Sequence, residues 1–138
     1  RIQFIEYYLK EKIEKDNVGL VVIDGIADLV SDVNDLEQSN NVVQKIMEWS
    51  QKFSCHIITV IHSNFGSDKP TGHLGSLLEK KTETQIQLET NTVNKDWITV
   101  KCKRSRGYAF DTFSFKVNNV GLPEIIGNLY NPLEGVSF

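Results

Sequence analysis

The sequence has little cysteine, no long apolar segment and no strong excess of charge. Two cysteines among 138 residues are too few for a disulfide framework, so Cys55 and Cys102 are expected to be reduced core thiols of a cytoplasmic protein. No apolar run approaches the roughly 20 residues of a transmembrane helix, and no signal-peptide pattern is present, so no membrane partner is expected. The net charge of −3 gives no global attraction for nucleic acid, so any nucleic-acid surface must be local.

A glycine-rich phosphate loop is missing as well. In such a loop a Gly-Lys-Ser or Gly-Lys-Thr step opens a helix, and the loop amides and the lysine hold the phosphates of ATP. None of the nine glycines is followed by lysine. We therefore expect this chain alone neither to bind ATP tightly nor to hydrolyse it.

The composition that remains is that of an ordinary globular protein, with 40% hydrophobic and 24% charged residues. The length suits a single domain over residues 1–138. Arg1 leads directly into a helical pattern without an initiator methionine or a cap, which indicates a piece of a longer protein.

Hydrophobic periodicity predicts an α/β fold, with a partial sheet flanked by helices followed by a C-terminal β-meander. Helices are expected at about 1–16, 36–53 and 75–81, and strands at about 19–24, 55–61, 84–90, 97–103, 110–117 and 122–127. Asp35 followed by Gln38 resembles a capping box for the second helix. That helix is expected to bury Leu36, Val43, Ile46, Met47 and Phe53.

The run Leu-Val-Val-Ile at 20–23, followed by Asp24 and Gly25, is typical of a buried parallel strand. Functional residues of open α/β sheets lie at the carboxyl ends of such strands. A carboxylate there is suited to hold Mg²⁺, often through water. Asp28 is expected to be a solvated turn residue. The next predicted core strand ends in the same way, at His62.

Four stretches therefore stand in a defined order: the strands at 20–25 and 57–62, the segment 74–79 with its Gly-Ser step, and the basic strand at 100–107. In this order they resemble the C-terminal half of a RecA-like ATPase core. The likeness is closest to hexameric replicative helicases and to the replication ATPases of plasmids and mobile elements. The first stretch resembles a Walker B strand, and the second resembles the strand that carries a polar sensor at its tip.

The resemblance implies an ATPase that acts on DNA in replication, mobilisation or repair, with ATP and Mg²⁺ as cofactors of the whole protein. Asp24 would lie on the Mg²⁺ side, and His62 would sense the γ-phosphate. The phosphate loop and the glutamate that activates water would precede Arg1. No cofactor is expected to bind this chain tightly by itself.

The resemblance also implies where DNA and neighbouring subunits would bind. The loop at 63–73 would face DNA in the channel of a ring, with Lys69, His73 and Ser76 as candidate contacts. The basic strand would place an arginine finger at a neighbour's nucleotide, through Arg106 or Arg104 with Lys103 as companion. A charged strand end is otherwise a solvated edge that prevents aggregation.

Two other classes of function stay open. Asp24, Asp28 and His62 could form the metal site of a hydrolase, which needs at least three converging ligands. Alternatively, the chain is a non-catalytic module that binds DNA or other subunits. Because an unpaired strand edge recruits another chain, we expect self-association here, by a strand-paired dimer.

Overall fold

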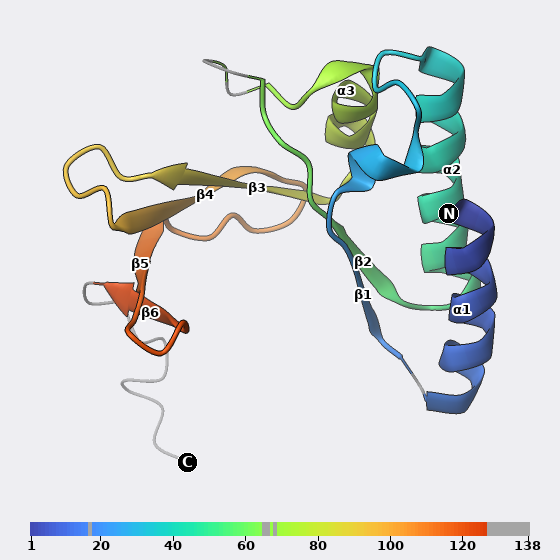
Figure 1. Cartoon of the computed structure of the whole chain (residues 1–138), viewed down its shortest axis with the longest axis horizontal. Coiled ribbons are helices and arrows are strands. Elements are labelled where there is room, and N and C mark those ends of the chain that lie inside the picture. Colours follow the sequence, from blue (N-terminus) through green and yellow to red (C-terminus); the bar gives the residue numbers. More distant parts are fainter. Residues whose placement is uncertain (17, 65–66, 68, 127–138) are drawn as a thin grey trace. The chain divides into compact units, whose positions relative to one another are not determined.

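The computed structural model describes residues 1–16, 18–64, 67 and 69–126, without the side chains of residues 13 and 14. The chain divides into two compact units, Arg1–Lys81 and Thr82–Phe138 (Figure 1). The prediction of a single domain stays a prediction. None of the described helices is long and apolar enough to cross a membrane.

The first unit contains a two-stranded parallel sheet and the helices around it. Its elements are α1 (Ile2–Asp16), β1 (Leu20–Ile23), the 3₁₀ helix η1 (Ile26–Leu29), α2 (Leu36–Lys52), β2 (His56–Thr59) and α3 (Gly72–Lys81). β1 and β2 pair in parallel, with Leu20 opposite His56 and Ile23 opposite Thr59. The predicted helices and core strands are confirmed, with two differences in their bounds. α3 begins three residues earlier than predicted, at Gly72 rather than Gly75. β2 ends at Thr59 rather than residue 61, so His62 lies three residues beyond the strand.

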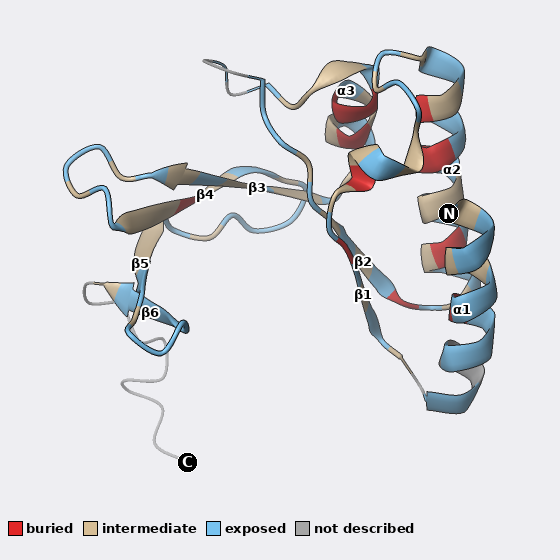
Figure 2. Cartoon of the chain, viewed as in Figure 1, coloured by how far each residue is buried: buried red, intermediate tan, exposed pale blue. Residues whose placement is uncertain are grey.

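The core of this unit lies between the sheet and the helices (Figure 2). Trp49, Ile26 and Leu74 are fully buried there. The prediction that Leu36 and Met47 are buried is wrong: Leu36 is 55% and Met47 36% exposed. Among the described residues of α2, those that are buried are Ser39, Val42, Val43 and Trp49.

Within the described residues, the β1–β2 pair is covered on one face only. Val21 and Ile57 pack against the core, whereas Leu20, Val22 and Ile58 are 53%, 58% and 43% exposed. The continuous apolar pattern predicted burial on both faces, as in most parallel sheets. Within the described part of the chain, helices cover only the Val21 face, so that prediction is wrong for the other.

Local polar contacts fix the start of α2. The Asp35 carboxylate accepts hydrogen bonds from the Gln38 backbone N–H at 3.0 Å and from its side-chain amide at 2.8 Å. The Gln38 bonds lower the pKa of the Asp35 carboxyl, because they favour its charged form. The predicted cap at Asp35 is therefore confirmed. It is not a complete capping box, because the Gln38 side-chain oxygen accepts hydrogen bonds from Ser31 and not from the Asp35 backbone N–H.

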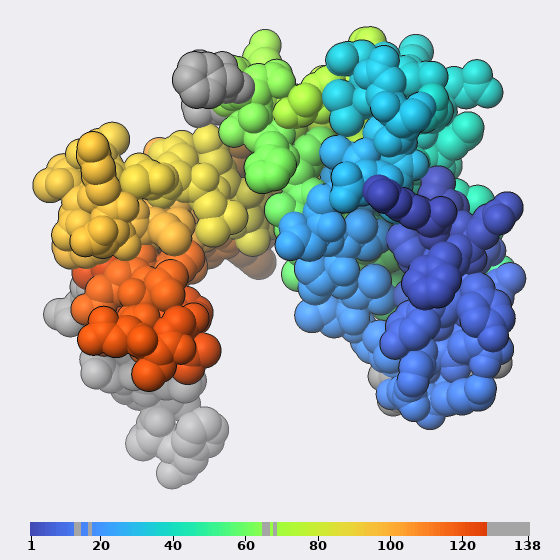
Figure 3. Space-filling view, viewed as in Figure 1, coloured from blue at the N-terminus to red at the C-terminus, as the bar shows by residue number. Residues whose placement is uncertain are grey.

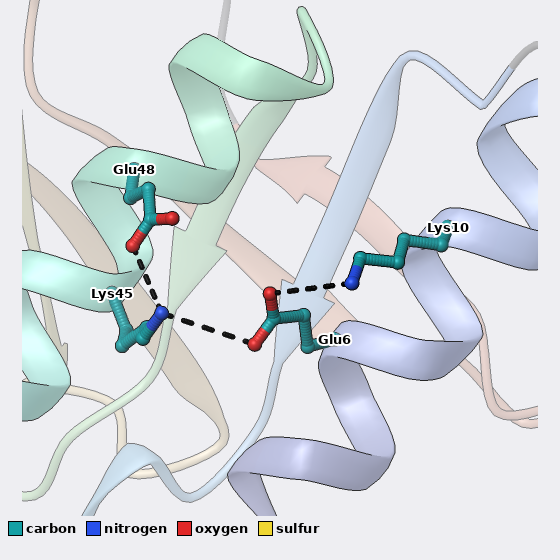
Figure 4. A network of polar contacts seen from close by, with 4 residues as sticks. All are labelled: Glu6, Lys10, Lys45 and Glu48. Carbon is teal, nitrogen blue, oxygen red and sulfur yellow. Dashed lines mark hydrogen bonds and ion pairs between the residues drawn. The ribbon is translucent and has the colours of Figure 1, made fainter.

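Ion pairs connect α1 to α2 on the surface of the unit (Figure 4). Lys45 of α2 lies 2.9 Å from Glu48 and 3.9 Å from Glu6 of α1, which also pairs with Lys10 at 3.7 Å. The hydrogen bond from Lys45 lowers the pKa of Glu48. Such pairs at the surface contribute little stability, and of these only the pair between Lys45 and Glu6 joins the two helices.

The second unit is the predicted β-meander. The strands β3 (Thr84–Thr90), β4 (Trp97–Ser105), β5 (Phe113–Val117) and β6 (Pro123–Ile126) pair antiparallel in chain order. β5 begins three residues later than predicted. A register shift between Gln85 and Ile86 interrupts the pairing with β4, so Arg104 lies opposite Gln85 and Cys102 opposite Ile86. The predicted end of the last strand, residue 127, lies outside the described residues.

Candidate functional site

The carboxyl ends of β1 and β2 lie side by side. The Val60 N–H donates to the Ile23 carbonyl at 3.0 Å, and the Ile26 N–H donates to the Val60 carbonyl at 3.0 Å. The pairing of the two strands therefore continues past their last regular residues. As a result, Asp24 and the segment leading to His62 leave the sheet at the same edge.

Asp24 stands at the turn out of β1. It is exposed, and in the described part of the chain its carboxylate has no hydrogen-bond or ion-pair partner. Gly25 follows in the left-handed conformation, with φ +79°, and turns the chain into η1. Since glycine adopts that conformation without steric cost, the Asp-Gly step releases the Asp24 carboxylate toward solvent.

Asp28 is held in a different way. Arg1 donates from Nη1 to the Asp28 backbone carbonyl at 2.8 Å, and the same nitrogen lies 3.8 Å from the Asp28 carboxylate. Asp28 is exposed, as predicted for a turn residue. Its ion pair makes it a structural contact between η1 and the start of α1 rather than a free ligand.

His62 has an exposed side chain and a firmly held backbone. Its carbonyl accepts two hydrogen bonds from Thr71, one from the N–H at 3.1 Å and one from Oγ1 at 2.8 Å. Thr71 directly precedes α3. Through Thr71, the segment that follows β2 is therefore connected to the start of α3.

The segment after His62 returns on itself. Ser63 and Pro70 form an antiparallel bridge, and the Asn64 N–H donates to the Lys69 carbonyl at 2.8 Å. Lys69 is exposed at the base of the loop, where the two chain segments pair. Residues 65, 66 and 68 of the predicted DNA-facing loop lie outside the described residues.

His73 and Ser76, the other predicted DNA contacts, lie in α3. The prediction that His73 belongs to the loop is wrong, because the helix already begins at Gly72. Both side chains are exposed, and Ser76 Oγ donates back to the Gly72 carbonyl at 3.2 Å. A hydroxyl that bonds its own helix is less available to a phosphate oxygen than a free one.

Two glycines allow α3 to pack closely. Gly72 has φ +68°, and a Cβ built on it would lie 2.6 Å from the Val33 carbonyl oxygen. A Cβ on Gly75 would lie 2.7 Å from Pro70. The Leu74 N–H donates to the same Val33 carbonyl at 3.1 Å. In the sequence, only the Thr-Gly pair at 71–72 marks the place where the start of α3 packs against Val33.

The basic residues Lys103, Arg104 and Arg106 belong to the second unit, at and beyond the end of β4. All three interact with other residues in the structure. The Arg106 N–H donates to the Glu83 carbonyl at 3.0 Å, which closes the end of the β3–β4 pair. Their predicted role at a neighbour's nucleotide stays a prediction.

A metal site was the basis of the hydrolase alternative. Among the described residues, no three His, Cys, Asp or Glu side chains gather in a way that could hold a metal ion. Asp24, Asp28 and His62 therefore do not form the converging set which that alternative requires.

Comparison with protein-family models and with curated proteins finds no match for this chain.

Proposed function

We propose that this chain is the C-terminal part of a RecA-like ATPase core, from a cytoplasmic protein that uses ATP hydrolysis to move or remodel DNA in replication, mobilisation or repair. The observation that supports the proposal is that Asp24 and the segment leading to His62 leave the same edge of two adjacent parallel strands. Open α/β sheets bind their ligands at this edge. β1 and β2 are parallel neighbours. The resemblance likewise implies a Walker B strand next to a sensor strand.

The Asp24 carboxylate fits a Mg²⁺ ion that is shared with a nucleotide. Mg²⁺ keeps several waters and is bound by one or two carboxylates together with substrate phosphates, rather than by an all-protein cage. A single exposed carboxylate without a partner among the described residues meets that requirement. The remaining ligands would be ATP phosphates, held by a phosphate loop that this chain does not contain.

His62 is suited to sense whether the γ-phosphate is present. Its exposed imidazole, three residues beyond β2, can donate a hydrogen bond to a phosphate oxygen. Because the His62 carbonyl is bonded to Thr71, a displacement of His62 would shift the base of the loop and the start of α3. That connection would transmit hydrolysis to Lys69, His73 and Ser76, the proposed DNA contacts.

The assembly we propose is a ring, as the resemblance implies. A basic residue of β4 or its end, Arg106 or Arg104 with Lys103, would then stabilise charge on the γ-phosphate of the neighbouring subunit. This arrangement requires the whole protein, because the phosphate loop lies outside the chain.

The test uses the whole protein, and it begins with the coding sequence upstream of Arg1. A Gly-x-x-x-x-Gly-Lys-Ser/Thr motif between a strand and a helix is expected within about a hundred codons. Asp24→Asn in that protein should then lower the ATP hydrolysis rate by at least about tenfold at saturating Mg²⁺. The matched control is Asp111→Asn, an exposed aspartate of the second unit, which should keep the rate.

His62→Ala is expected to uncouple ATP hydrolysis from DNA binding. The variant should retain nucleotide binding and lose most of the stimulation of hydrolysis by DNA. Absence of the motif upstream, or an Asp24→Asn rate equal to that of the control, would exclude the ATPase. Salt-sensitive DNA binding without hydrolysis would instead identify a non-catalytic module.

A further inference from the structure

Thr71, the residue before α3, holds the His62 backbone with its side chain as well as its main chain. Thr71 Oγ1 donates to the His62 carbonyl at 2.8 Å, and the Thr71 N–H donates to the same oxygen at 3.1 Å. A carbonyl oxygen has two lone pairs, so these two bonds occupy both. Any residue except proline could supply the N–H, whereas the bond from Oγ1 needs a hydroxyl at this position.

The support on which Thr71 stands is rigid. Pro70 precedes it with a fixed φ, and a Cβ built on Gly75 would lie only 2.7 Å from Pro70. The Thr71 carbonyl accepts the Gly75 N–H at 3.0 Å, which ties it to the first turn of α3. That turn is anchored by the fully buried Leu74, whose N–H donates to the Val33 carbonyl at 3.1 Å. Thr71 is therefore attached to a fixed part of the core.

His62 depends on this attachment more than a core residue would. It lies three residues beyond β2 with an exposed side chain, and Figure 3 shows the segment after β2 (green) at the surface of the first unit. The bridge between residues 63 and 70 is flanked by the backbone bond from Thr71 and by one from the Asn64 N–H to the Lys69 carbonyl at 2.8 Å. Because an exposed residue gains little from packing, its hydrogen bonds decide where the imidazole lies.

We infer that Thr71 is a positioning residue, whose hydroxyl fixes where the His62 imidazole stands. Its effect on ATP hydrolysis rests on the proposed function, whereas its effect on the base of the loop does not. In the whole protein, the hydroxyl would keep the imidazole directed at the γ-phosphate. Without the hydroxyl the backbone bond remains, so the chain still folds, but the base of the loop opens more often.

The first experiment measures amide hydrogen exchange by NMR in the 138-residue chain. Thr71→Val removes the hydroxyl and keeps the N–H and the branched shape. It should speed exchange at residues 64 and 71 by about three- to tenfold, which corresponds to one neutral hydrogen bond. Exchange at Leu74, whose N–H bonds to the Val33 carbonyl, should stay within about twofold and verifies that α3 is intact. Thr71→Ser keeps a hydroxyl and should leave all three rates within about twofold.

In the whole protein, ATP hydrolysis with and without DNA tests whether Thr71 acts through His62. Thr71→Val should lower the stimulation by DNA by about three- to tenfold, and Thr71→Ser should retain most of it. Adding Thr71→Val to His62→Ala should lower the stimulation no further, because residues that act as a unit are not additive. The matched control is Thr90→Val, at an exposed threonine of β3, which should keep the stimulation.

Unchanged exchange at residues 64 and 71 in Thr71→Val would overturn the inference, whatever the whole protein does. Unchanged stimulation by DNA in a protein that His62→Ala uncouples would overturn it as well, and so would additive losses in the double variant. If the whole protein hydrolyses no ATP, the proposed function fails, and faster exchange in Thr71→Val still supports the positioning of His62 by the hydroxyl.

Discussion

Gly72→Ala is expected to lower the stability of the first unit more than Gly25→Ala or Gly19→Ala. The backbone has φ +68° at this position, which costs a residue with a Cβ about 1–2 kcal/mol. The new Cβ would also lie 2.6 Å from the Val33 carbonyl oxygen and 2.9 Å from its carbon. That carbonyl cannot withdraw easily, because it accepts hydrogen bonds from the Leu74 N–H at 3.1 Å and from Ser39 Oγ at 3.4 Å.

Overpacking of this kind costs about 1–3 kcal/mol. Together with the backbone term, the free energy of unfolding should fall by about 2–5 kcal/mol. For a unit of this size, that change lowers Tm by at least about 8 °C. The assay is thermal and urea unfolding followed by far-UV circular dichroism.

Two other glycines of the same unit separate the backbone cost of a positive φ from the steric cost of the new Cβ. Gly25 has φ +79°, but its nearest atom is the flexible Asp28 carboxylate at 3.3 Å, so Gly25→Ala should show only the backbone cost of about 1–2 kcal/mol. Gly19 has no atom within 4 Å of a new Cβ, so Gly19→Ala should change stability by less than about 0.5 kcal/mol. A Gly72→Ala loss no greater than that of Gly25→Ala would refute the close-packing argument.

Two further substitutions test the core and the helix cap. Trp49→Ala should cost about 3–5 kcal/mol of unfolding free energy. Trp49→Phe should cost much less in the same unfolding assay, because the buried Trp49 Nε1–H has no hydrogen-bond partner in the described part of the chain. Equal losses would contradict this. Asp35 has a lowered pKa, so its contribution to stability is present above the unfolded-state pKa and is lost as the pH falls through the folded-state value. Asp35→Asn retains a capping oxygen and should flatten this part of the stability-versus-pH curve, and an unchanged curve would assign the dependence to another group.

Much of the local structure followed from residue patterns. The apolar run before Asp24 predicted β1, and the spacing of Asp35 and Gln38 predicted where α2 begins, because both signals are local in the chain. The β-meander followed from strand patterns separated by turn residues. The boundary of α3 was missed, since its start depends on Gly72 packing against Val33, a contact between segments far apart in the sequence.

Burial and partnership were decided by the tertiary structure. The same apolar pattern occurs on both faces of β1, yet only packing determined that Val21 is covered while Leu20 and Val22 are exposed. The sequence offered Asp24, Asp28 and His62 as the ligands of one alternative metal site, but it could not show their partners. The fold gave Asp28 an ion pair and bonded the His62 carbonyl to Thr71. The sequence by itself determined which segments become helices and strands, because periodicity and caps act within a few residues. Which strand edge stays free, and which carboxylate stays available, depends on contacts between distant segments that only the folded chain brings together.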